Sequence, residues 1–285
     1  MVQYLKLLPA LLPFALFFVG GIIVTLVQSF GMMNPLAHHD SIWTAYATIL
    51  TQGRFTLLIL FSVYVALVSS ILAVILGTAL AYTIWKLPPA MQVKTVVYKI
   101  PIILPHIAVA FITMIFLSRS GIISSICHSL GIISDIQEFP DLIFSRYGIG
   151  EIVAYTAKET SFVALMAMSV LVRFDRRYID TARQLGAGRM RIFFQVVLPR
   201  LRGILLTTFL ILFIYSLGAF EIPYILGTDN PGMLSLHVYN YYFMHDLSDR
   251  PIAMALLMIL FVVCLLLAVV YFRLSHKPRH EQVEN

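Results

Sequence analysis

The chain has 285 residues, of which 60% are hydrophobic and only 12% are charged, and its formal net charge is +6. A soluble domain of this length would carry about 25% charged residues, so the composition excludes an ordinary soluble protein. Several apolar runs exceed the roughly 18 residues that a helix needs to cross a hydrocarbon layer, which indicates a polytopic membrane protein. The two cysteines, Cys127 and Cys264, offer neither a disulfide framework nor a metal-binding spacing, and we expect no metal site.

Six apolar runs are predicted to be transmembrane helices, because backbone N–H and C=O groups cannot stay unpaired in lipid. They lie at about 7–30, 56–85, 100–118, 149–172, 203–226 and 252–272. The first run is longer than the roughly 7–15 apolar residues of a signal peptide, so we interpret it as a retained span. Pro101 and Pro105 are placed in the first turns of the third helix, where proline is tolerated.

The connections between the runs differ strongly in positive charge. One side of the membrane holds 15 of the 20 Lys and Arg residues and the other side holds 4, with Lys158 inside the fourth run. The positive-inside rule therefore predicts that both termini and the basic segment 173–202 are cytoplasmic. Because topology accounts for the positive charge, we expect no nucleic-acid partner.

The two longest outer connections are not simply polar. GIISSICHSLGII (121–133) has apolar positions at helical spacing, which predicts a short helix at the outer membrane interface. The connection 227–251 carries an Asn-Pro-Gly turn signal followed by the aromatic stretch HVYNYYF.

The basic segment 173–202 has an amphipathic pattern. Asp175 is a suitable N-cap for a first helix that begins one residue later. Tyr178, Ala182 and Leu185 then share one face of this helix at i, i+4 and i+7 spacing.

A turn and a second helix are expected to follow. Gly186 and Gly188 can supply positive φ for the turn, a second helix is expected over about 189–197, and Pro199 is expected to end it. Such a basic helical hairpin can lie on lipid headgroups, or it can dock into a groove of a soluble protein. The pattern by itself leaves both alternatives open.

The same stretch resembles the EAA loop of binding-protein-dependent ABC importer permeases of the MetI-like type. The pattern of that loop is E-A-A, three residues, G, nine residues and I-x-L-P. In this chain it reads Asp180-Thr181-Ala182, then Gly186, then Val196-Val197-Leu198-Pro199, with both spacings kept. Asp180 replaces the usual Glu and Thr181 replaces the first Ala, which bears on the detailed docking geometry.

The resemblance implies a type I ABC importer permease fold in a bacterial inner membrane, with a cytoplasmic coupling-helix hairpin. The implied partners are two cytoplasmic ATPase subunits, a second permease subunit of different sequence and an external solute-binding protein. ATP and Mg would be bound by the ATPase subunits, because this chain has no GxxxxGK[ST] loop, and no cofactor or catalytic residue is expected in it. The residues implied to dock the ATPase are Tyr178, Asp180, Ala182, Leu185, Gly186, Ala187 and Arg189.

The resemblance covers roughly residues 56–272, which would form the core permease domain. Residues 1–55 would supply an N-terminal span and an outer loop, and 273–285 a cytoplasmic tail. GAFEIPYILG (218–227) and DLSDRPIAMA (246–255) look most like the polyamine (spermidine/putrescine) permeases, a group that also includes importers of iron, thiamine and phosphonates.

Ionisable residues inside the spans are candidates for the solute pathway, because a charge at mid-bilayer costs ~2.5–3.5 kcal/mol. Lys158 and Glu159 are adjacent in the fourth run, so their side chains should point apart. Glu159 would either line a cation pathway or make an interhelical hydrogen bond. Glu221 and Tyr224 lie near the outer end of the fifth run, where Pro223 favours a helix break facing a cavity, although a hydrated helix end is the alternative. An acidic vestibule would favour a polyamine-like cationic solute.

Two other classes of membrane protein are alternatives to the importer permease. A secondary carrier or channel would work without an ATPase partner and would need no cytoplasmic docking hairpin. A membrane enzyme would need a catalytic constellation at depth, and neither HExxH nor GxSxG occurs in the sequence.

Overall fold

The computed structural model describes residues 8–33, 42–88, 90–91 and 95–275, and all regular structure within them is helical. The predicted all-α class is therefore confirmed. The chain divides into two compact units, residues 1–60 with 234–285 and residues 61–233. The tail beyond residue 275 and the residue that begins the first predicted span lie outside the described part.

Within the described residues, five helical segments are long and apolar enough to cross a membrane by length and composition. They are Leu11–Ser29, Gly53–Lys86, His106–Ser129, Arg189–Gly218 and Leu247–Arg273. The fourth predicted run forms a helix of 23 residues, α10 (Ile149–Leu171), which carries three charged residues and is not among these five. The count of six spans and the side on which the termini lie stay predictions.

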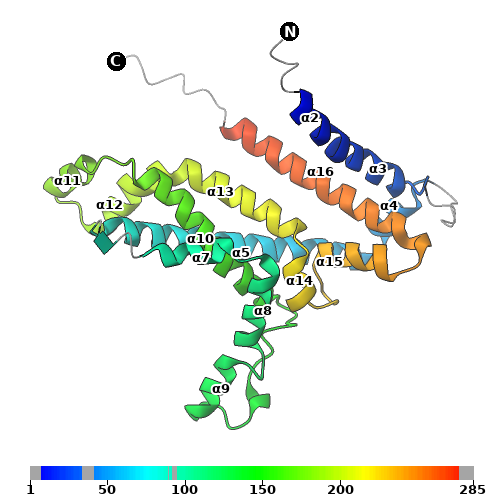
Figure 1. The fold of residues 1–285 in the computed structure, drawn as a ribbon, viewed down its shortest axis with the longest axis horizontal. Helices are drawn as coiled ribbons and strands as arrows, with labels where there is room; N and C mark the ends of the chain where they lie inside the picture. The colour runs from blue at the N-terminus through cyan, green and yellow to red at the C-terminus, as the bar shows by residue number, and fades with distance from the viewer. Residues whose placement is uncertain (1–7, 34–41, 89, 92–94, 276–285) are drawn as a thin grey trace. The chain divides into compact units, whose positions relative to one another are not determined.

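The first unit combines the two ends of the chain. Its elements are α2 (Leu8–Phe14), the π-helical turn η1 (Ala15–Val19), α3 (Gly20–Ser29), α4 (Thr44–Thr51), the first turns of α5 (Gly53–Lys86), α15 (Leu234–Tyr239), η5 (Asn240–Met244), η6 (Leu247–Asp249) and α16 (Arg250–Ser275). α16 packs along α3, α4 and α15 (Figure 1). Apolar side chains of α4, α5, α15 and α16 form the core of this unit, in which Phe55 and Leu256 are fully buried.

The second unit is built around α10. Its other elements are the rest of α5, η2 (Thr95–Lys99), α7 (Ile100–Ile103), α8 (His106–Leu117), α9 (Ile122–Ser129), η3 (Ile136–Glu138), α11 (Arg177–Gln184), α12 (Arg189–Ile192), the π-helical turn η4 (Phe193–Val197), α13 (Leu198–Gly218) and α14 (Glu221–Leu226). α10 contacts α7, α8, α13 and α14, and 13 of its 23 residues are buried. Because α10 is surrounded largely by protein, it tolerates charged residues that a lipid-facing helix would not.

Two apolar clusters hold α10 in place. One joins α5 and α10 to the segment from α11 to α13, and the other joins α5 and α10 to α8 and α14. The α10 residues of the first cluster lie between Val163 and Leu171, at the end of the helix that leads into α11. α10 therefore connects the basic hairpin to the part of the unit where two helices are broken.

Two of the predicted helices are broken rather than continuous. The prediction of one helix over 100–118 is wrong, because α7 ends at Ile103 and α8 begins at His106. Leu104 is extended (φ −68°, ψ 135°), since a residue that precedes proline is excluded sterically from the helical region and Pro105 also lacks an N–H. The break predicted near Pro223 is confirmed, because α13 ends at Gly218 and α14 begins at Glu221.

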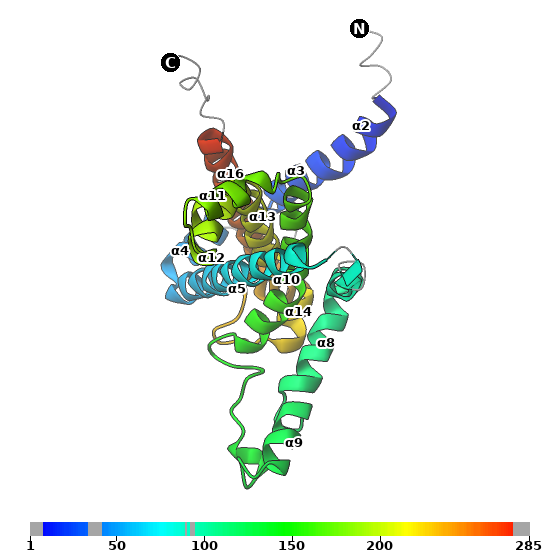
Figure 2. The ribbon, with the colours of Figure 1, turned by 90° about the vertical axis from the view of Figure 1, so that its left-hand side faces the viewer.

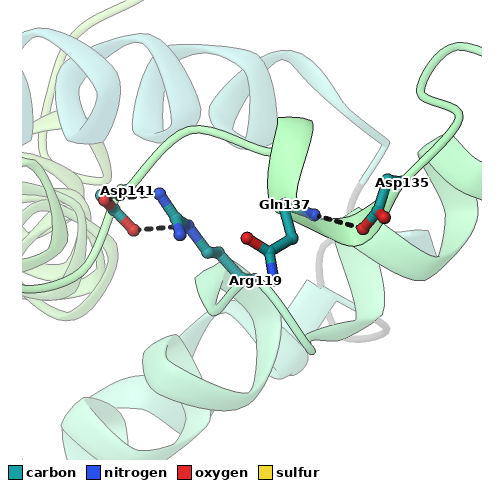
Figure 3. A network of polar contacts seen from close by, with 4 residues as sticks. All are labelled: Arg119, Asp135, Gln137 and Asp141. Atoms are coloured by element: carbon teal, nitrogen blue, oxygen red, sulfur yellow. Dashed lines mark hydrogen bonds and ion pairs between the residues drawn. The ribbon is translucent and has the colours of Figure 1, made fainter.

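α8 and α9 project away from α10 and α13 in both views (Figures 1 and 2). The helix predicted within 121–133 is confirmed as α9, while its placement at the membrane interface stays a prediction. Figure 3 shows the polar contacts of this arm, in which Arg119 forms an ion pair of 2.6 Å with Asp141. Asp135 Oδ1 accepts a hydrogen bond of 2.9 Å from the Gln137 N–H and so caps η3. The ion pair ties the end of α8 to the segment that returns to α10.

Candidate functional site

The basic hairpin begins as the sequence predicts. The Arg177 N–H donates a hydrogen bond of 3.0 Å to Asp175 Oδ1, so this side chain satisfies one of the free N–H groups at the start of α11. α11 then runs to Gln184.

The turn after α11 depends on one glycine rather than two. The Gly186 N–H donates to the Arg183 carbonyl at 2.9 Å, and the Ala187 N–H donates to the Ala182 carbonyl at 3.0 Å. This pair of bonds is the Schellman motif, which needs a single left-handed residue, and Gly186 supplies it with φ +79°. The prediction of positive φ at Gly188 is wrong, since its φ is −71°.

The prediction that Pro199 ends the second helix is also wrong. α12 passes through the π-helical turn η4 directly into α13, so helix continues from Arg189 to Gly218. Pro199 cannot donate the N–H that a continuous α-helix uses at this position, and the wider π-helical turn directly before it accommodates the missing bond and the ring. The second helix of the hairpin, α12, is consequently the first part of a long helix.

The hairpin has a buried face and an exposed face. Ile179 and Ile192 are buried in the cluster with α5 and α10, and Ala182 and Ala187 pack against the same cluster. On the other face Tyr178 is 60% exposed, Leu185 83% and Met190 70%. Of the residues predicted to share one face, Ala182 is therefore half-buried, whereas Tyr178 and Leu185 are accessible. Their assignment to ATPase docking stays a prediction.

The last turn of α5 forms the base on which the hairpin rests. The Arg176 guanidinium lies 5.1 Å from the centre of the Trp85 ring and donates a hydrogen bond of 3.2 Å to the Trp85 carbonyl. Phe174 packs edge-on against Trp85 at 5.7 Å, and Phe193 packs on Tyr82 at 4.8 Å. The sequence analysis did not predict this base. The pattern that could have indicated it is a pair of large aromatic residues, Tyr82 and Trp85, one turn apart at the end of the second span.

A cleft of about 560 Å³ lies between this base and the hairpin. Its lining residues are Tyr82, Trp85, Lys86, Arg176, Ile179, Asp180, Arg183, Arg189 and Ile192. Asp180 is the only acidic residue among four cationic ones, and its carboxylate lies 3.5 Å from Arg183. Two residues predicted to dock a partner, Asp180 and Arg189, are thus brought together at one cationic cleft.

Lys158 and Glu159 point in different directions, as their adjacency on one helix predicts. Glu159 is 3% exposed, and its Oε1 accepts a hydrogen bond of 2.8 Å from Ser216 Oγ of α13. This bond agrees with the interhelical alternative for Glu159. The other oxygen, Oε2, has no hydrogen-bond partner among the described residues.

Lys158 is 8% exposed, and its Nζ donates hydrogen bonds to the carbonyls of Pro101, at 3.1 Å, and Leu104. Both carbonyls belong to the break between α7 and α8. A carbonyl left unpaired away from water costs several kcal/mol, and a buried ammonium without acceptors is similarly unfavourable. The break and the lysine therefore stabilise each other.

Glu151 is a buried acid that sequence reasoning missed. It is 1% exposed, and a side chain at Gly148 or Gly227 would lie within 2.8 Å of its carboxylate oxygens. Neither oxygen, nor the hydroxyl of the fully buried Tyr155, has a hydrogen-bond partner among the described residues. Glu151, Tyr155 and Glu159 are spaced at i, i+4 and i+8. This spacing could have predicted that they share one face of α10.

Glu221 and Tyr224 lie on the exposed side of α14, and Tyr224 is 53% exposed. The ring of His106, at the start of α8, lies 4.7 Å from that of Tyr215 on α13. Glu221 interacts electrostatically with both of these residues. The two helix breaks thus gather His106, Tyr215, Glu221 and Tyr224 into one accessible region, named here the break patch. Within the described residues, no group of three His, Cys, Asp or Glu side chains could hold a metal ion.

A sequence model of the family described as "Binding-protein-dependent transport system inner membrane component" matches residues 73–280. Three curated relatives illustrate the range of similar proteins. The sulfoquinovosyl glycerol transport system permease protein SmoG of Agrobacterium fabrum is 29% identical over 119 residues, which cover 41% of this chain and 39% of SmoG. The trehalose/maltose transport system permease protein MalF of Thermococcus litoralis is 26% identical over 82% of this chain and 79% of its own. The spermidine/putrescine transport system permease protein PotB of Salmonella typhimurium is 24% identical over 81% and 78%.

The fold is similar to that of a solved bacterial ABC transporter involved in the import of the acidic polysaccharide alginate. The TM-score is 0.76 at 18% sequence identity, with 98% of this chain and 96% of the other covered. A second structure describes the alginate transporter in complex with an alginate pentasaccharide-bound periplasmic protein, with a TM-score of 0.75, 18% identity and coverage of 97% and 94%. At this identity the likeness establishes the fold.

Proposed function

Because this chain belongs to the family of binding-protein-dependent transport system inner membrane components, we propose that it forms part of the solute pathway of an ATP-driven importer. It is a multi-pass permease subunit of the ABC importer class and has the type I permease fold. The finer parts of the proposal concern its partners, its pathway and its solute.

The observation that carries the proposal is the hairpin of α11 and α12. Its exposed face combines Tyr178, Leu185 and Met190 with arginines, and its buried face is fixed to α5 and α10 through Ile179 and Ile192. A surface that is apolar, basic and rigidly backed suits the groove of a soluble protein. We assign this surface to a cytoplasmic ATPase subunit, which would hydrolyse ATP outside this chain.

The full transporter would contain two ATPase subunits, a second permease subunit of different sequence and an external binding protein. The alginate transporter, which shares the fold, has been solved with a ligand-bound periplasmic protein. That precedent supports a binding protein on the outer side of this chain. Closure of the ATPase pair would move the hairpin, and the long helices on either side of it would carry the movement to the pathway.

The break patch supports a pathway assignment for Glu221 and Tyr224. Ionisable groups on a membrane-spanning unit avoid lipid and face a water-filled route or another protein. His106 and Tyr215 extend the predicted pair, whereas Glu159 lies behind this surface and bonds to Ser216. An acid beside aromatic rings suits a cationic solute such as a polyamine, and aromatic rings also suit a sugar.

The solute is the least constrained part of the proposal. Relatives named for sugars (SmoG and MalF) and for polyamines (PotB) match this chain at similar identity. We favour a polyamine-like cation because of Glu221. Iron, thiamine and phosphonate stay alternatives from the sequence patterns at 218–227 and 246–255.

Reconstitution tests the proposal. The purified complex, with its ATPase subunits and binding protein, would be placed in proteoliposomes and supplied with labelled spermidine, trehalose or thiamine. We expect uptake of one solute that requires ATP, the binding protein and a hydrolysis-competent ATPase. Uptake that persists without ATP would identify a secondary carrier or channel instead.

A further inference from the structure

The break between α7 and α8 removes the helical donors of two particular carbonyls. In a continuous helix the Pro101 carbonyl would accept from the N–H of residue 105, but that residue is a proline and has no N–H. The Leu104 carbonyl would accept from Ala108, but the Ala108 N–H donates to the Pro105 carbonyl at 3.0 Å instead. These two carbonyls are the ones that Lys158 Nζ binds.

Lys158 also lies on the helix that leads to the hairpin. Val163 and Leu171, farther along α10, are fully buried in the cluster that contains Ile179 of α11 and Ile192 of α12. α10 is unbroken from Ile149 to Leu171, so a displacement of the hairpin reaches Lys158 through a rigid element. From there the ammonium is bonded to the backbone of a different helical segment.

We propose that Lys158 is a positioning residue that ties the break between α7 and α8 to α10, so that movement of the hairpin is passed to α8. This inference rests on the proposed importer function, because it assigns the transmission step within it. α8 carries His106, so the step ends at the break patch. A purely structural role, in which Lys158 only satisfies two carbonyls, is the alternative.

Substitution of Pro105 separates these two roles. Pro105→Ala supplies a backbone N–H at position 105 and allows the Pro101 carbonyl to bond within a continuous helix, so it removes the need for an external donor. Lys158→Met keeps the length of the apolar stem and removes the donor. The double variant therefore has satisfied carbonyls and lacks the Lys158 link, leaving only the apolar packing between α8 and α10. Lys99→Met, which removes an exposed lysine from η2, is the matched control.

The experiment compares these variants in the reconstituted complex by thermal stability, ATP hydrolysis and solute uptake. Lys158→Met should lower uptake at least about tenfold, which is the factor that corresponds to the loss of a single hydrogen bond to a charged group. In the double variant, stability and ATP hydrolysis should recover while uptake per ATP stays low. Recovery of uptake in the double variant would show that Lys158 only satisfies the two carbonyls and does not transmit movement. Uptake by Lys158→Met at the level of the unsubstituted complex would show that Lys158 has no role in transmission.

A distance measurement decides the matter even if Pro105→Ala alone impairs uptake or Lys158→Met is less stable. Spin labels replace Ile115 on α8 and Leu165 on α10, which are 57% and 37% exposed, in a chain lacking Cys127 and Cys264. With Lys158 present, the label separation should be narrow and should shift when a nucleotide binds the ATPase. With Lys158→Met it should broaden and lose the shift, and an unchanged shift would overturn the proposal. Failure of the importer function itself would appear separately, as no ATP-dependent uptake in the unsubstituted complex.

Discussion

Replacement of Gly77 by alanine is expected to separate α5 from α10. A Cβ atom at this position would lie 2.5 Å from Val163 Cβ and 2.7 Å from the Thr160 carbonyl oxygen. Both atoms are fixed to the α10 backbone and cannot rotate away, so the helices themselves must move. Small residues at such contacts are what lets membrane helices approach closely.

The expected change in the stability of Gly77→Ala is the sum of two opposing free-energy contributions. Overpacking of a tightly packed contact costs roughly 1–3 kcal/mol, and contacts below 3 Å to backbone atoms favour the upper part of that range. Alanine in a helix interior is more favourable than glycine by about 0.5–1 kcal/mol, which offsets part of the loss. We therefore expect a net destabilisation of roughly 1–2 kcal/mol for Gly77→Ala.

Gly203→Ala in α13 is the matched control, because a Cβ atom there would meet no other atom within 4 Å. It should show only the favourable helix term. The assay is the unfolding midpoint of each purified variant in the same detergent or nanodisc. A Gly77→Ala midpoint at or above that of Gly203→Ala would mean that α5 and α10 are not in close contact at this position.

Three further predictions concern the hairpin, the pathway and the arm. Gly186→Val should abolish ATP-coupled uptake while the chain still inserts, because a β-branched residue at φ +79° costs at least roughly 1–2 kcal/mol; normal uptake would argue against docking. Glu221→Gln should change uptake kinetics without changing co-purification of the subunits, and unaltered kinetics would remove Glu221 from the pathway. Arg119→Ala should lower the unfolding free energy by at most about 1 kcal/mol, because Arg119 and Asp141 are 46% and 64% exposed; a larger loss in a thermal melt would contradict this estimate.

The sequence predicted features that depend on neighbouring residues. The Asp175 cap, the glycine turn at Gly186 and the short helix α9 each follow from a few residues and their spacing. The break before Glu221 was predictable in the same way, because Pro223 and Gly218 both disfavour a continuous helix. Local chemistry was sufficient for all of these features.

Features that depend on distant residues could not be predicted. Whether Pro105 is tolerated or breaks the helix depends on a donor for the freed carbonyls, and that donor is Lys158, more than fifty residues away. The base of the hairpin likewise joins Trp85 to Arg176 across the chain. Glu151 is enclosed only because Gly148 and Gly227, on separate segments, leave room for its carboxylate.

A site-specific cross-link would report whether the hairpin docks on an ATP-hydrolysing subunit. A photoreactive residue would replace Leu185, which is 83% exposed on the hairpin, or Leu130, which is 69% exposed after α9. In the assembled complex, we expect that only the probe at position 185 attaches to the ATPase subunit. Attachment from position 130, or none from position 185 in a complex that hydrolyses ATP, would contradict it.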